Sequence, residues 1–441
     1  MKLIHIGGGG GQLRVSEDGT YPIRMSELVP QIGRTFRWHV TQSIFFDGHY
    51  IVSKKSFDLS PSFCTAGTTL CLSPRPFSAS SDPKSYVSAN HRIRAIMCNS
   101  KLHRFLEGLP KVELHLHIEG TLSPELLFKL AATNKIELPK DDPAFASPEA
   151  LQARYDRFTS LSDFLHYYYI GMSVLLTEAD FTFLAYEYFS RVYADKCVHS
   201  EIFFDPQAHT SRGVAYDTVV KGIAEAQRKA KEDFGITSKL IMCFLRDMAV
   251  ASANDHFTLA ANHSYFADGT IAGIGLDSAE VGFPPELFRD VYAQAKEAGV
   301  HRTAHAGEEG GTDYLSGALD NLQVERIDHG VRLAEDTDLM KRVAAEKKLL
   351  TLCPISNVKL QVVKAVSELP IRKFLDAGVQ ICFNSDDPAY FGGYLLDNFC
   401  AVEEAFGLSI EEWKGTADAA VRGSWADEER KEEILAQIDA Y

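Results

Sequence analysis

The sequence predicts an α/β protein whose main part is a (β/α)8 barrel of the TIM type. From Lys111 onward, short runs rich in β-branched and aromatic residues alternate with longer amphipathic stretches, which is typical of repeated βα units and a parallel sheet. Eight such short runs can be counted, and eight strands close this kind of barrel. The chain has 441 residues, of which 45% are hydrophobic, so it can bury one core of that size.

Predicted strands and helices alternate in chain order. We expect the strands at residues 112–118, 199–204, 239–245, 271–276, 302–305, 326–329, 349–352 and 379–384. Amphipathic helical patterns between them cover residues 124–132, 163–176, 217–231, 285–298, 336–346 and 369–377. Extra helices are predicted after the first strand, within residues 141–194, and two more at the C-terminus, within residues 409–441.

The first hundred residues differ from the rest of the chain. They show no sustained helical or alternating pattern, and residues 72–90 are rich in Ser and Pro. We therefore divide the chain into two parts. Residues 1–100 are predicted to be an N-terminal extension that is either disordered or not native to the expressed protein, and residues 101–441 are predicted to form the barrel.

Composition excludes several classes of partner. A net charge of -15 disfavours binding to nucleic acid or to an anionic membrane, because phosphates would be repelled over most of the surface. No apolar run is long enough to span a bilayer, and no secretory signal is recognisable. The eight cysteines include no C-x-x-C pair and indicate reduced thiols. We expect a protein of the cytoplasm, or also of the nucleus, that binds a small molecule; its oligomeric state is not indicated.

Four residues with metal-binding side chains stand at predicted strand ends. His115 and His117 are two apart on the first strand, so they point to the same face. His305 ends the fifth strand and Asp386 follows the eighth. In such barrels the carboxyl ends of the strands meet at one end, where active sites are assembled. Singly, the H-x-H pair could be ordinary strand histidines, His305 a core histidine and Asp386 a helix N-cap, but together they predict one site.

Three imidazoles and one carboxylate form a nitrogen and oxygen donor set that suits Zn²⁺ and leaves room for a water molecule. A water bound to zinc becomes a nucleophile near neutral pH. We therefore predict one zinc ion per chain, held by His115, His117, His305 and Asp386.

Three further polar residues flank the predicted ligands. Glu308 follows His305 by three residues and is free to move a proton, with burial expected to raise its pKa. His329 ends the sixth strand and could orient the water and stabilise charge that develops on it. Asp387 is left to hydrogen-bond a substrate, or alternatively to act as a second helix cap.

The motifs KVELHLHIEG, TAHAGE, RIDHG and NSDDP, in this order, resemble those of the adenosine/AMP deaminase family of metal-dependent hydrolases, over about residues 102–405. The resemblance implies that the four predicted ligands hold zinc and that an activated water adds to C6 of a purine, which then loses ammonia. It further implies that Glu308 donates a proton to N1, that His329 assists the water and that Asp387 contacts the base.

The substrate expected from this resemblance is the free base adenine. Relatives that act on nucleosides typically read H-x-D-G after the first strand, whereas this chain reads H-I-E-G, and the longer Glu119 could occupy the space that a sugar needs. Residues 204–213, 275–280 and 354–358 also look like the adenine deaminase branch, including its fungal type. Ser278 stands where nucleoside deaminases have a glycine that contacts N3, so we expect Ser278 and Glu119 at the substrate.

The resemblance thus predicts hydrolysis of adenine to hypoxanthine and ammonia, a reaction of purine salvage. One alternative is an adenosine deaminase, since the core motifs are shared. Another is a catalytically silent relative that serves as a binding or signalling module. Such a relative is expected to lose a zinc ligand or the proton donor, and this sequence retains both.

Overall fold

The computed structural model describes residues 2–5, 12–15, 37–46, 49–58 and 100–441, and the chain divides into two units, Met1–Ser81 and Asp82–Tyr441. In the first unit, two pairs of antiparallel strands are described: β1 (Lys2–His5) with β2 (Gln12–Val15), and β3 (Arg37–Phe46) with β4 (His49–Asp58). The rest of residues 1–99, including the Ser/Pro-rich stretch 72–90, lies outside the described residues. The expectations for this segment therefore stay predictions.

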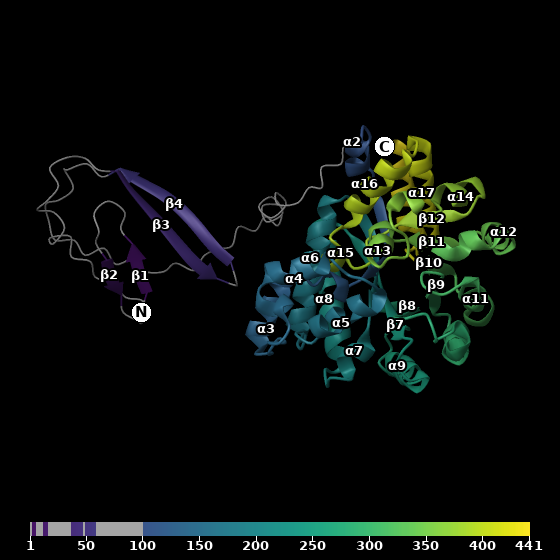
Figure 1. Cartoon of the computed structure of the whole chain (residues 1–441), viewed down its shortest axis with the longest axis horizontal. Helices are drawn as coiled ribbons and strands as arrows, with labels where there is room; N and C mark the ends of the chain where they lie inside the picture. Colours follow the sequence, from purple (N-terminus) through teal and green to yellow (C-terminus); the bar gives the residue numbers. More distant parts are fainter. Residues whose placement is uncertain (1, 6–11, 16–36, 47–48, 59–99) are drawn as a thin grey trace, which may run out of the picture. The chain divides into compact units, whose positions relative to one another are not determined.

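The second unit contains eight parallel strands that form one barrel, as predicted. They are β5 (Lys111–His117), β6 (Cys197–Phe204), β7 (Thr237–Leu245), β8 (Ile271–Asp277), β9 (His301–Ala306), β10 (Arg326–His329), β11 (Leu349–Leu352) and β12 (Gln380–Phe383). Each strand pairs with the next along the chain. Figure 1 shows the helices arranged around these strands. Every predicted strand end agrees with the structure to within two residues.

The barrel closes between its first strand and the residues that follow its last. The backbone N–H of His117 donates to the carbonyl of Asp386 over 3.0 Å, and the N–H of Asp386 donates to the carbonyl of His115 over 3.1 Å. Leu116 and Asp386 form the corresponding parallel bridge. Three of the four predicted metal ligands therefore lie on the closing seam, at the carboxyl ends of the strands.

Helices follow the strands in the order that βα units require. The α-helices of the second unit are α2 (His103–Gly108), α3 (Pro124–Asn134), α4 (Pro148–Tyr155), α5 (Leu161–Met172), α6 (Glu178–Ala194), α7 (Pro206–Thr210), α8 (Tyr216–Phe234), α9 (Val250–Asn262), α10 (Arg289–Glu297), α11 (Thr312–Gly317), α12 (Thr337–Ala345), α13 (Pro354–Lys359), α14 (Ile371–Asp376), α15 (Pro388–Phe391), α16 (Leu395–Phe406), α17 (Ile410–Gly423) and α18 (Glu428–Ala440). The extra helices after the first strand and the two at the C-terminus are present as expected.

Local sequence explains where the longer helices begin and end. The Thr177 side chain accepts from the N–H of Asp180, and the Asp180 side chain accepts in return, which caps α6. Helix α8 ends at Gly235, whose φ of +72° lies in the left-handed region that glycine tolerates. One helix was predicted too long: α5 ends at Met172 instead of 176, because residues 173–176 form the turn that leads into the Thr177 cap.

The sequence analysis also expected reduced cysteines and no membrane-spanning segment. The cysteines of the barrel are buried and take part in no disulfide (Cys197, Cys243, Cys353, Cys382 and Cys400). Among the residues that the structure describes, no helix is both long and apolar enough to cross a membrane.

Candidate active site

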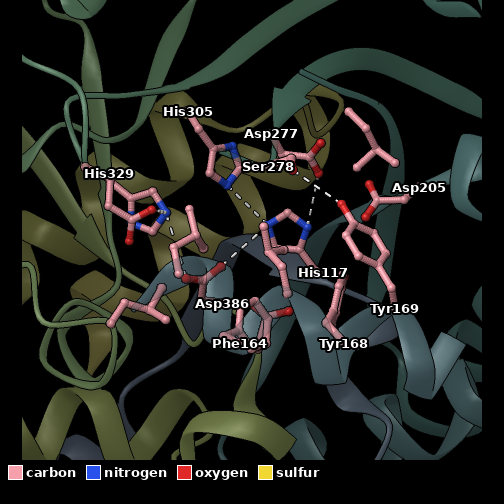
Figure 2. Close-up of a pocket in the computed structure, with 16 residues that line it drawn as sticks. His117, Phe164, Tyr168, Tyr169, Asp205, Asp277, Ser278, His305, His329 and Asp386 are labelled. Carbon is pink, nitrogen blue, oxygen red and sulfur yellow. Dashed lines mark hydrogen bonds and ion pairs between the residues drawn. The ribbon is translucent and has the colours of Figure 1, made fainter. Parts of the chain in front are cut away.

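A cavity that is partly open to solvent lies at the carboxyl ends of the barrel strands (Figure 2). Seven of the nine residues that the sequence analysis assigned to the site line it: His117, Ser278, His305, Glu308, His329, Asp386 and Asp387. The other two, His115 and Glu119, are fully buried beside it.

The four predicted metal ligands converge on one point. Nε2 of His115 lies 3.1 Å from Oδ1 of Asp386, and Nε2 of His117 lies 3.5 Å from the same oxygen. Nε2 of His117 and Nε2 of His305 are 3.2 Å apart. Nε2 of His115 is buried and has no hydrogen-bond partner among the described residues. A buried nitrogen without a partner, facing a carboxylate and two other imidazoles, is the arrangement that a metal cation satisfies.

A hydrogen-bond chain behind His115 determines which of its nitrogens faces the cluster. Nδ1 of His115 lies 2.9 Å from Oγ1 of Thr351, and that hydroxyl donates to Oδ1 of Asp328 over 3.0 Å. Because the hydroxyl has one proton and gives it to Asp328, it can only accept from His115. Nδ1 therefore carries the proton, and Nε2 presents its lone pair to the cluster, as a metal ligand must.

The protonation states of the cluster are those that bind a metal. Burial lowers the pKa of His117 to about 3 and holds the pKa of His305 well below its usual value, with His115 adding to the effect at both. Burial by itself would raise the pKa of Asp386, but the neighbouring His115 outweighs it and the net shift is downward. His117 and His305 are therefore neutral imidazoles beside an ionised Asp386 carboxylate.

His329 lies as close to this cluster as the predicted ligands do. Its Nε2 is 3.8 Å from Oδ2 of Asp386, and the ligand atoms of His115, His305, His329 and Asp386 all lie within 4.8 Å of one another. A second group with the same spacing joins His117 to Asp205 and Asp277. The geometry therefore places His329 at the metal position as well. It does not decide whether His117 or His329 is the third histidine ligand.

Glu308 is held at the cavity by its neighbours. Asn357 donates from Nδ2 to Oε1 of Glu308 over 3.1 Å, and Oε2 lies 3.5 Å from Nε2 of His329. Burial, reinforced by the charge of Asp386, raises the pKa of Glu308 well above its usual value. A protonated carboxyl group at the cavity wall can donate a proton to a bound molecule.

The loop that carries Glu308 is anchored by Glu280. The Glu280 carboxylate accepts from the backbone N–H groups of Gly307, Glu308 and Gly310 over 3.1, 3.2 and 2.7 Å. Gly307 has a φ of +75°, and a Cβ there would come within 2.9 Å of Leu315. The glycine of T-A-H-A-G-E is thus required by the turn and by close packing.

Asp387 lines the cavity, and its buried Oδ1 has no hydrogen-bond partner among the described residues. A Cβ on Gly120 would lie 2.0 Å from that oxygen. The glycine of H-I-E-G therefore leaves the space in which the Asp387 side chain stands.

The sequence analysis expected Glu119 at the substrate, but in the structure Glu119 does not line the cavity. Its Oε1 accepts from the backbone N–H of Asp205 over 3.1 Å and lies 2.9 Å from Nε2 of His209. Asp205, at the end of β6, lines the cavity instead. Ser278 does line it, with a φ of +67° and its hydroxyl 3.3 Å from the hydroxyl of Tyr169.

The sequence analysis assigned no role to four residues of the site: Asp205, Asp277, Glu280 and Asn357. Asp205 and Asp277 come directly at the carboxyl ends of two barrel strands. The rule that selected Asp386, a carboxylate at a strand end, could have selected both of them. For Glu280, which lies in a loop, and Asn357, which lies in α13, no comparable sequence signal exists.

Comparison with known proteins decides the family. The family described as "Adenosine deaminase" matches residues 110–441. The chain belongs to this family. A protein called adenine deaminase from Schizosaccharomyces pombe is 52% identical over 342 residues, covering 78% of this chain and 93% of that protein. Another of the same name, from Aspergillus fumigatus, is 53% identical over 347 residues, covering 78% and 98%. These fungal relatives confirm the resemblance stated from the motifs.

Two solved structures share the fold of this chain. An adenine deaminase from Arthrobacter aurescens is 48% identical with a TM-score of 0.71, covering 75% of this chain and 98% of that one. An amidohydrolase from Burkholderia ambifaria, solved with bound Zn, is 27% identical with a TM-score of 0.69, covering 80% and 96%.

Proposed function

We propose that this protein hydrolyses adenine to hypoxanthine and ammonia with the help of one zinc ion, as a step of purine salvage. The observation that carries the proposal is a cavity in which three imidazoles and a carboxylate converge beside a buried glutamate whose pKa burial raises. About half of the chain's matched residues are identical to those of proteins called adenine deaminase, over nearly their whole length.

The metal would be held by His115, His117, His305 and Asp386. The donor set contains no sulfur and is one that zinc accepts, and a family relative was solved with zinc. When bound, zinc supplies the activation of a water molecule as a nucleophile at neutral pH.

The protein's own residues handle the protons and the ring. Glu308 donates its proton to N1 of the purine, which makes C6 more electrophilic. His329, whose pKa burial lowers to about 3, is neutral and lies beside the metal position, where its ring can orient the attacking water by a hydrogen bond. The water adds its hydroxyl group to C6 and releases a proton. The C6–N6 bond breaks, the amino group takes up that proton and leaves as ammonia, and the C6 hydroxyl proton returns to Glu308 as the carbonyl forms.

The walls of the cavity suit a flat aromatic ring. Asp387 lines the cavity with a carboxyl group whose Oδ1 has no hydrogen-bond partner among the described residues, so it can form a hydrogen bond with the base, and Ser278 lines the cavity as well. Apolar and aromatic side chains also line the cavity and help to exclude water from the ring: Leu161, Phe164, Leu165, Tyr168, Tyr169, Leu245 and Leu360.

The test is a side-by-side assay of the purified protein with adenine, adenosine and AMP, followed by the loss of substrate absorbance. We expect kcat/KM for adenine to exceed that for the other two by roughly 100-fold or more. Faster turnover of adenosine would favour the adenosine deaminase alternative and overturn the proposal. No turnover of any of the three by metal-loaded protein would favour the silent relative.

Glu308→Gln is the matched control for this assay. It keeps the side chain's size and its contact with Asn357 but cannot donate the proton. We expect kcat to fall by roughly 10³-fold while the metal stays bound. An unchanged kcat would remove Glu308 from the proposed reaction.

Localisation in the cytoplasm or nucleus, and the absence of nucleic-acid and membrane partners, stay predictions from composition.

A further inference from the structure

Two carboxylates line the cavity at the side away from His329. Figure 2 shows Asp205 and Asp277 beyond His117, next to Tyr169, while His329 and Asp386 lie on the other side of His117. Asp205 follows the last residue of β6, and Asp277 is the last residue of β8. The cavity therefore has a reacting side and an acidic side.

The acidic side is buried and incompletely hydrogen-bonded. Asp205 and Asp277 are 1% and 2% exposed, and their carboxyl groups interact with each other, but Oδ1 of each has no hydrogen-bond partner among the described residues. An unpaired polar group in such a position is costly unless something satisfies it. Because both residues line the cavity, a molecule bound there can supply the missing hydrogen bonds.

Asp205 is held in place from behind. Its backbone N–H donates to Oε1 of Glu119 over 3.1 Å. The same oxygen lies 2.9 Å from Nε2 of His209, and Nδ1 of His209 lies 2.7 Å from the guanidinium of Arg212. Pro206 then begins α7. This buried chain fixes the backbone from which the Asp205 side chain extends, as a specific binding group requires.

The chemistry of a purine identifies what the acidic side can recognise. In the orientation that the proposed function requires, C6 and N1 face the metal position and Glu308. The opposite edge of the ring system then carries N3 and N9. In the free base N9 or its neighbouring ring nitrogen carries a hydrogen, whereas in a nucleoside N9 is bonded to the sugar carbon.

We propose that Asp205 is the specificity-determining residue for the free base, accepting a hydrogen bond from the N–H of the purine's N9 edge, and that Glu119 acts as its positioning residue. The inference rests on the proposed function for the orientation of the ring. A substituent at N9 removes the donor and leaves a buried carboxyl group unpaired, and sites built in this way reject such analogues strongly.

The test measures binding of the reaction product, which does not turn over. Hypoxanthine and 9-methylhypoxanthine are titrated into the metal-loaded protein, and the ratio of their dissociation constants is taken. We expect wild-type protein to favour hypoxanthine by roughly 100-fold, and Asp205→Ala to reduce the preference to less than about 10-fold. Asp205→Asn, which keeps the size and one carbonyl oxygen, should give an intermediate ratio.

Asp290→Ala is the control variant, because Asp290 is an exposed carboxylate in the first turn of α10 that does not line this cavity. Its ratio should stay within about 3-fold of wild type. If Asp205→Ala weakens both ligands equally, or leaves the ratio unchanged, Asp205 does not select the free base.

The outcome is separable from that of the proposed function. Selective hypoxanthine binding that depends on Asp205, in a protein that does not turn over adenine, would overturn the reaction and support the assignment of Asp205. Adenine turnover with a binding ratio that is independent of Asp205 would do the reverse.

Discussion

The two ends of the barrel differ in how completely their buried polar groups are paired. At the amino end, Arg326 and Glu201 form a fully buried ion pair, and Arg326 also donates to the carbonyl of Leu114 over 3.2 Å. The ring of Trp425 lies 4.2 Å from the Arg326 guanidinium, and Trp425 gives its backbone N–H to Glu201. The charge of Arg326 is thus matched by Glu201, and at this pair only Nε of Arg326 lacks a hydrogen-bond partner among the described residues.

At the carboxyl end, an oxygen of Asp205, of Asp277 and of Asp387 lacks a partner among the described residues. Three non-glycine residues there adopt left-handed backbone conformations: Ser278, His329 and Asp386, with φ of 67°, 63° and 64°. Such conformations cost on the order of 1 kcal/mol each. The comparison teaches that the amino end provides stability, while the carboxyl end gives up stability to place groups for a ligand.

The sharpest contrast between the ends comes from Asp386→Asn. Removing a charged metal ligand should lower kcat/KM for adenine by on the order of 10⁴-fold. The melting temperature of the metal-free protein should change by only a few degrees, because the amino end is untouched. Kinetics and thermal unfolding check both expectations. A large fall in the melting temperature would show that Asp386 stabilises the fold, and would contradict the division of roles between the two ends of the barrel.

At the opposite end, Arg326→Met should mainly affect folding. The substitution leaves Glu201 buried without its cation, and we expect the free energy of unfolding to fall by about 3–5 kcal/mol. Denaturant titration measures this loss. The double variant Arg326→Met/Glu201→Met should be less destabilised than the single variant, since no uncompensated charge remains. A loss below about 1 kcal/mol in the single variant would contradict the assigned role.

The same ion pair should make stability sensitive to acid. Burial alone would raise the pKa of Glu201, but Arg326 and His199 outweigh it and lower the pKa to about 2, against 4.5 for the unperturbed group. A lowered carboxyl pKa contributes stability that is present above pH 4.5 and is lost as the pH falls towards 2. The contribution is about 3 kcal/mol. Denaturant titrations from pH 6 to 3 should show a shallower decline for Glu201→Gln than for wild type; equal slopes would contradict it.

Glu280→Gln tests whether the Glu308 loop is positioned by the carboxylate that accepts its N–H groups. Losing the charge should lower kcat by roughly 10-fold to 100-fold, since hydrogen bonds to a charged group are the stronger kind. KM should stay within about 3-fold, because Glu280 does not line the cavity. Steady-state kinetics separates the two constants, and Glu309→Gln serves as the neighbouring control. A rise in KM without loss of kcat would assign Glu280 to substrate binding instead.

Features of the fold and the site that depend on local sequence patterns could be predicted from the sequence, whereas contacts between residues far apart in the chain could not. The strand pattern located all eight strands, and the rule for strand ends placed His115, His117, His305 and Asp386 at one end, where the structure has them. These inferences use only local periodicity and the barrel's parallel order.

The position of Glu119 shows where sequence reasoning stops. Its carboxylate is directed to Asp205 and His209, residues 86 and 90 positions away. The sequence placed Glu119 near the substrate but gave no information on its rotamer or partners. The contact of Glu280 with Gly307, Glu308 and Gly310 likewise depends on how two loops fold together, which no local pattern encodes.

The most direct test of the central claim is the metal content of the purified protein, measured by inductively coupled plasma mass spectrometry. The account predicts about one zinc per chain in wild type and in Glu308→Gln, and little metal in His115→Ala. An active wild-type protein without bound metal, or a His115→Ala variant that retains the full amount, would contradict it.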